Sequence, residues 1–151
     1  MTSDIEKQLD RAITVLGIPI EVFRKCAPDH AKLIVGKARE RFVIGNPRAW
    51  WMALKQPFES FDYSEGLGFE DLIRHIPTGN DKCWFVPETE EEYPPVFDAT
   101  VGRITEVLGE CAYFEYYLIG KEFDWLVLEN DHNQIIVSRS TDNQSQRLRS
   151  K

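Results

Sequence analysis

The sequence predicts an α+β protein in which N-terminal helices pack on an antiparallel sheet. Two observations support this fold class. Apolar residues recur at helical spacing between residues 5 and 42, and three strand-like segments follow one another at about 112–138. Helices thus dominate the first third of the chain and strands the last third. This order is typical of an α+β fold and not of repeated strand–helix–strand units.

The N-terminal region contains the main helical part of the chain. Apolar residues at helical spacing predict a helix over residues 5–16, which Gly17 ends as the first residue beyond it. A short helical segment is expected over residues 18–26, and Pro28 suits the first position of a third helix. The third helix has one apolar stripe, which consists of Ala31, Ile34, Val35, Ala38 and Phe42.

The middle of the chain mixes helices, strands and loops. Residues 48–56 (RAWWMALKQ) are compatible with a buried strand or a helix, and we favour a strand because prolines flank the segment. Five further segments lead to the C-terminal strands, and the last of them is a helix that Asp98 caps. They are an edge strand or loop at 58–65, a helix at 69–76, a short strand at 83–86, an acidic loop at 88–95 (ETEEEYPP) and a helix at 98–109.

The residues at about 112–138 predict a meander of three antiparallel strands. In its first strand both alternating sets of side chains are largely apolar or aromatic, which is typical of an inner strand covered on both faces. Gly120 and Lys121 predict a two-residue hairpin turn. The polar residues 129–133 predict the second turn, and the β-branched residues 135–137 complete the last strand.

The chain of 151 residues suits one domain with a sizeable core. We expect a single domain at 1–138 and a flexible tail at 139–151, because the tail is polar. No apolar run approaches the roughly 20 residues that span a bilayer, and the N-terminus lacks the apolar stretch of a signal peptide. Three widely spaced cysteines argue against a disulfide framework, so a cytoplasmic location is expected.

Charge is unevenly distributed along the sequence. The net charge is −7, but residues 58–131 contain 18 acidic and 4 basic residues, whereas residues 1–57 contain 6 acidic and 10 basic ones. An acidic surface repels nucleic acid and favours a basic protein partner. The alternative is that the acidic residues serve only to keep the protein in solution.

The acidic loop and nearby tyrosines are the predicted partner-binding residues. Clustered carboxylates can imitate a polyanion and bind a basic groove, and exposed aromatic residues beside carboxylates occur at binding hot spots. The alternatives are a solvated loop and tyrosines that belong to the core. The predicted set is Glu88, Glu90, Glu91, Glu92, Tyr93, Tyr113 and Tyr117.

The turn at residues 129–132 gives an alternative function. Glu129, Asp131 and His132 could bind a divalent cation or supply a general base, as in a metal-binding protein or a hydrolase. Ordinary turn chemistry explains the same residues, because Asn and Asp bond their own backbone. The sequence assigns no catalytic residue and no cofactor. A third hypothesis is a structural homodimer or larger homo-oligomer, in which exposed aromatic residues pair between copies.

Residues 114–138 resemble the C-terminal part of a group of small bacterial proteins of unknown function. The match consists of Asp124-Trp125-Leu126 in a strand and Glu129-Asn130-Asp131-His132 in the following turn. It covers about a sixth of the chain and implies a similar α+β fold without an established activity. In acidity, size and fold class, the chain is also similar in kind to immunity proteins of bacterial toxin systems. That similarity implies a protein-binding function, with a basic toxin as the partner.

Overall fold

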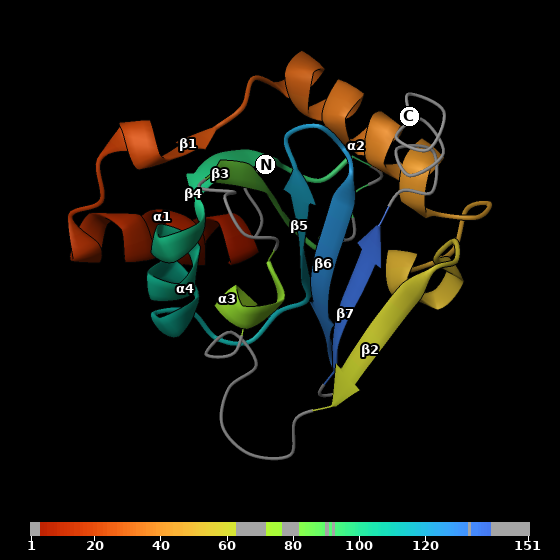
Figure 1. Cartoon of the computed structure of the whole chain (residues 1–151). Coiled ribbons are helices and arrows are strands. Elements are labelled where there is room, and N and C mark those ends of the chain that lie inside the picture. The colour runs from red at the N-terminus through yellow and green to blue at the C-terminus, as the bar shows by residue number, and fades with distance from the viewer. Residues whose placement is uncertain are drawn as a thin grey trace, which may run out of the picture.

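The structure, a computed structural model, describes residues 4–62, 72–76, 82–89, 91, 93–132 and 134–139. These residues form a central antiparallel sheet with helices on both of its faces, and Figure 1 shows this arrangement. The predicted α+β class is confirmed. No helix among the described residues has the length and apolar character needed to cross a membrane.

The N-terminal region supplies helices to both faces of the sheet. Its elements are the helix α1 (Asp4–Leu16), the 3-10 helix η1 (Ile20–Val22), the strand β1 (Phe23–Lys25) and the helix α2 (Pro28–Phe42). Gly17 ends α1 with a φ of 64°, a conformation that glycine adopts without strain. Pro28 occupies the first turn of α2, as predicted. The helical prediction at 18–26 is wrong in its second half, because the backbone of β1 pairs with a neighbouring strand.

Seven strands among the described residues form one sheet with the order β1-β4-β3-β5-β6-β7-β2, and all neighbouring strands are antiparallel. The strands after β1 are β2 (Phe58–Asp62), β3 (Lys82–Pro87), β4 (Phe97–Thr100), β5 (Tyr116–Gly120), β6 (Trp125–Asn130) and β7 (Gln134–Arg139). The other helical elements are η2 (Trp50–Ala53), α3 (Leu72–His75) and α4 (Val101–Gly109).

The predicted meander is present as β5, β6 and β7. Its first strand begins at Tyr116 and not at residue 112. The first turn is also longer than the predicted pair of residues, because β5 ends at Gly120 and β6 begins at Trp125. Within this turn the Phe123 N–H donates to the Gly120 carbonyl over 2.9 Å. Phe123 itself has a φ of 56°, which closes this turn with a residue other than glycine.

Two other predictions are wrong. Residues 48–56 do not form a strand; Trp50–Ala53 form η2, where the Trp50 ring is buried against Tyr117 of the sheet. Asp98 does not cap α4 but lies within β4, because residues 97–100 fill the position between β1 and β3. Alternation in β4 buries Phe97 and Ala99, while the Asp98 carboxylate accepts a hydrogen bond from Lys121 Nζ over 2.8 Å.

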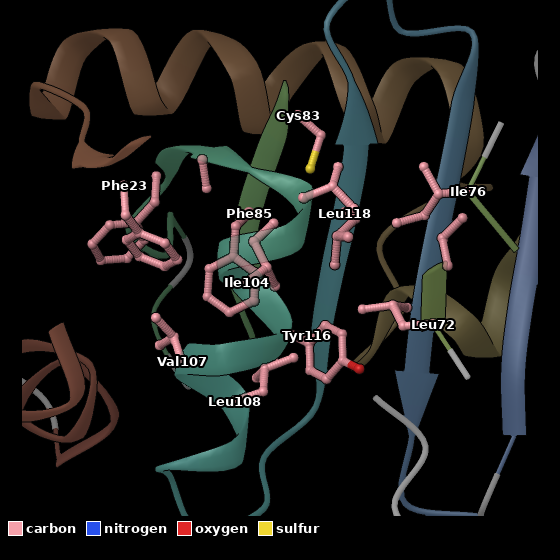
Figure 2. Close-up of a cluster of buried hydrophobic side chains, with 14 of the residues drawn as sticks. Phe23, Leu72, Ile76, Cys83, Phe85, Ile104, Val107, Leu108, Tyr116 and Leu118 are labelled. Carbon is pink, nitrogen blue, oxygen red and sulfur yellow. The ribbon is translucent and has the colours of Figure 1, made fainter. Parts of the chain in front are cut away.

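The sheet separates two apolar cores, because alternate side chains of each strand point to opposite faces. Figure 2 shows part of the first core, in which Phe85 and Tyr116 of the sheet pack with Leu72 of α3 and Ile104 of α4. The second core lies on the other face and contains the apolar stripe of α2, Trp50 of η2 and the opposite side chains of β5 and β6. The strand β5 is therefore covered on both sides, as its sequence predicted.

Candidate functional site

A cleft of about 960 Å³ opens on the α2 side of the sheet. Three parts of the chain line it: the end of α2 with the segment 46–52, the connection between β3 and β4, and the residues that flank β5 and β6. The charged, aromatic and thioether side chains of the lining include Arg39, Arg48, Trp50, Trp51, Met52, Glu88, Glu91, Glu115, Asp131 and His132. The cleft is large enough for a side chain or a short peptide segment.

The segment 46–52 contributes the apolar part of the lining. The Trp50 ring stacks on Tyr117 with a centroid distance of 4.5 Å, which fixes the segment on the second core. Trp51 is partly buried, and its ring meets the His132 ring edge-on at 5.1 Å. Met52 follows with 60% of its surface exposed. A thioether and an indole ring are thus presented beside the polar residues of the cleft.

Glu88 connects the cleft to the second core. The Tyr117 hydroxyl donates a 2.6 Å hydrogen bond to Glu88 Oε2 and accepts a 3.3 Å bond from the Trp50 N–H. Burial raises the pKa of the Glu88 carboxyl, although the Tyr117 hydroxyl and the positive charge of Arg39 oppose this rise. The negative charge of the carboxylate is therefore poorly solvated in the unliganded protein.

Glu115 lies next to Glu88, because the Glu88 N–H donates to the Glu115 carbonyl over 2.8 Å. Its Oε2 atom accepts a 2.9 Å hydrogen bond from the Asp131 N–H. Burial raises the pKa of Glu115; the hydrogen bond from the Asp131 N–H opposes this rise, and the negative charges of Asp131 and Glu88 add to it. Asp131 in turn has its Oδ1 atom 3.5 Å from His132 Nε2. Three carboxylates thus lie in succession along the cleft.

The carboxylates outnumber the cations among the lining residues of the cleft. Glu88, Glu91, Glu115 and Asp131 are acidic, whereas Arg39 and Arg48 are basic. Arg39 lies over the rings of Trp50 and Tyr93, with centroid distances of 5.9 and 5.3 Å. The lining therefore has a negative balance, and a bound cation would relieve the repulsion between Glu88 and Glu115.

The predicted partner-binding residues lie in three different environments. Glu88 and Glu91 line the cleft, and Tyr93 is 39% exposed beside Arg39. Tyr113 is 55% exposed and borders a second, smaller pocket beneath α4. Tyr117 is 1% exposed, so its ring belongs to the core and its hydroxyl supports Glu88. The remaining two predicted residues, Glu90 and Glu92, lie outside the described residues.

The three predicted metal ligands are not brought together. Glu129 is 3% exposed, and its Oε1 atom accepts a 2.6 Å hydrogen bond from the Tyr116 hydroxyl on the first-core side. Asp131 and His132 lie at the cleft on the other side. The part of the chain that the structure describes contains no group of three or more His, Cys, Asp or Glu residues arranged to hold a metal ion.

Sequence reasoning did not select three residues that shape the cleft. Arg39 belongs to the polar side of α2, and Trp51 belongs to a segment that the sequence left between strand and helix. Glu115 is the acidic residue immediately before the apolar strand YYLIG. A lone carboxylate at the entry of a fully buried strand was the one signal in the sequence that could have identified this position.

Comparison with known proteins places the chain in a family. The model of a family of unknown function (DUF6756) matches residues 1–149, which is nearly the whole chain. Neither a search of curated proteins nor a search of solved structures gives a match.

Proposed function

The chain belongs to the family of unknown function DUF6756, and we propose that it is a protein-binding module whose cleft takes a basic partner. One observation carries this proposal: interface-type side chains and an excess of carboxylates line the same cleft. Trp, Met and Arg are enriched at protein–protein interfaces, and here Trp51, Met52 and Arg48 lie in one short segment.

The two kinds of side chain would contribute to binding in different ways. Covering an apolar side chain as exposed as Met52 stabilises a complex by up to about 1.5–3 kcal/mol. The carboxylates contribute mainly to the rate of association and to the choice of partner, because complementary charge steers encounter and disfavours like-charged proteins. The acidic half of the sequence extends this field beyond the cleft.

In biological terms, we propose that the partner is a basic toxin and that the protein acts as its cytoplasmic immunity protein. The support is chemical: an immunity protein must bind a basic toxin tightly, and an acidic cleft with aromatic residues suits that task. Capture of the partner would identify it. Co-expression of the captured protein with and without this chain would then test neutralisation.

The test compares two matched pairs of variants in capture from a lysate of the organism that makes the protein. Met52→Ala and Glu91→Lys alter the cleft, whereas Val15→Ala and Glu122→Lys alter equally accessible positions away from it. Val15 lies on α1, on the other side of the sheet, and Glu122 lies in the turn between β5 and β6, at the opposite end of these strands.

We expect the unaltered protein to retain one basic protein in stoichiometric amount and to release it at high salt. The two cleft variants should retain much less of that protein, and the two control variants should retain it fully. Equal retention by all four variants would show that the cleft is not the binding site. Retention of the partner by the unaltered protein at high salt would contradict the charge argument.

A further inference from the structure

We infer that the group that enters the cleft is an arginine side chain of the partner, held by Glu88 and Glu115 with its guanidinium against Trp51. This inference rests on the proposed function and makes it more specific. It commits to one chemical group, the guanidinium ion, in place of basic protein in general.

The two carboxylates are held in place before any ligand arrives. The Oε2 atom of Glu88 accepts the Tyr117 hydroxyl over 2.6 Å, and the Oε2 atom of Glu115 accepts the Asp131 N–H over 2.9 Å. The backbone bond from Glu88 to Glu115 holds the two residues side by side. Binding a cation at this position therefore costs little ordering of either side chain.

The arrangement of the carboxylates favours a planar cation over a compact one. The acidic residues of the cleft repel one another, yet no three His, Cys, Asp or Glu residues of the described chain converge as metal ligands. A compact ion would thus contact too few of them. A guanidinium carries five N–H donors in a planar fork and can bond separated carboxylates at the same time.

Trp51 adds an aromatic ring to the lining of the cleft. It belongs to η2, and its ring contacts the His132 ring at a centroid distance of 5.1 Å, with 73° between the two ring planes. Guanidinium ions stack on indole faces more often than ammonium ions do, and they lose less hydration when they leave water. Arg39 shows the same chemistry within the protein, because its guanidinium lies over the Trp50 and Tyr93 rings.

The test is a titration with the peptide acetyl-Gly-Arg-Gly-amide, followed by the NMR signal of the Trp51 indole N–H. The signal is assigned by its disappearance in the Trp51→Phe variant. Two peptides of the same length carry lysine or citrulline instead, and citrulline keeps the shape of arginine without its charge. Glu88→Gln and Glu115→Gln remove one charge each and keep an oxygen acceptor, while Glu122→Gln removes a charge far from the cleft.

We expect saturable binding of the arginine peptide that is about tenfold tighter than that of the lysine peptide, with no saturation by citrulline. Glu88→Gln and Glu115→Gln should each weaken binding about tenfold, since each removes a charge-assisted contact. Glu122→Gln should leave it unchanged. Thermal unfolding of each variant verifies that the fold is retained.

Equal binding of the arginine and lysine peptides, or no binding of either, would overturn the inference. An unchanged affinity in both Glu→Gln variants that remain folded would do the same. These results leave the proposed function standing if Met52→Ala still abolishes capture of the partner. Conversely, arginine-specific binding combined with undiminished capture by the cleft variants would refute the proposed site of partner binding.

Discussion

Tyr117→Phe removes a hydroxyl that joins the second core to the cleft, and the structure gives the expected loss of stability. Tyr117 is 1% exposed, and its hydroxyl donates to Glu88 and accepts from the Trp50 N–H. A hydrogen bond to a charged group contributes about 1.5–3 kcal/mol, and a buried donor left unpaired costs about 1–3 kcal/mol. Since water reaches the Glu88 side of the cleft, we expect a total loss of about 2–4 kcal/mol.

Urea unfolding at pH 7, followed by tryptophan fluorescence, measures this loss in the free energy of unfolding. Tyr93→Phe is the matched control, because Tyr93 is 39% exposed and its ring contacts with Lys32 and Arg39 do not need the hydroxyl. That control should change stability by no more than about 0.5 kcal/mol. If Tyr117→Phe costs no more than the control, the hydroxyl does not support the cleft as described.

Three further predictions concern pH, packing and thiol chemistry. Burial raises the pKa of Glu88 in the folded state, so ionisation of Glu88 opposes folding as the pH rises above about 4.3. Glu88→Gln should therefore gain stability relative to the unaltered protein between pH 4 and pH 7. If urea unfolding gives the same difference in the free energy of unfolding at both pH values, this prediction is wrong. A Cβ atom at Gly120 would lie 2.5 Å from Trp125 Nε1, so Gly120→Ala should lower the free energy of unfolding by about 1–3 kcal/mol. An added Cβ atom at Gly36 in α2 would meet no atom within 4 Å, so Gly36→Ala should raise the free energy of unfolding by about 0.5–1 kcal/mol. Equal changes in the free energy of unfolding for the two alanine variants would contradict the packing at Gly120. Complete burial raises the pKa of the Cys83 thiol, so a thiol reagent at pH 8 should label the two partly exposed cysteines of the native protein and reach Cys83 only in urea, as mass spectrometry would show.

The meander and the two long N-terminal helices could be predicted because their signals are local. Helical spacing determines which face of α2 is buried, and double-sided apolar alternation marks β5 as an inner strand. The strand β4 was missed for a physical reason. It has only four residues and lies between β3 and β1, and β1 is distant in the sequence, so its conformation depends on tertiary contacts that no local pattern records.

The site was less predictable than the fold. Glu88 and Glu91 were selected from the acidic loop, and Asp131 and His132 from the turn, but nothing in the sequence joined the two sets. The fold joins them, because β3 and β6 both pair with β5 and both end beside its first residue, Tyr116. Glu129 still belongs to β6 and bonds Tyr116 on the first-core side, whereas Asp131 and His132 follow the strand in the turn and line the cleft.

The most direct test of partner binding at the cleft is site-specific photo-crosslinking. A photoreactive phenylalanine derivative placed at Met52, which is 60% exposed, should form a covalent adduct with one basic protein in a lysate of the source organism. The same group at Val15, which is 62% exposed on the other side of the sheet, should form no adduct with that protein. An adduct from Val15 but not from Met52 would place the partner away from the cleft and contradict the proposed function.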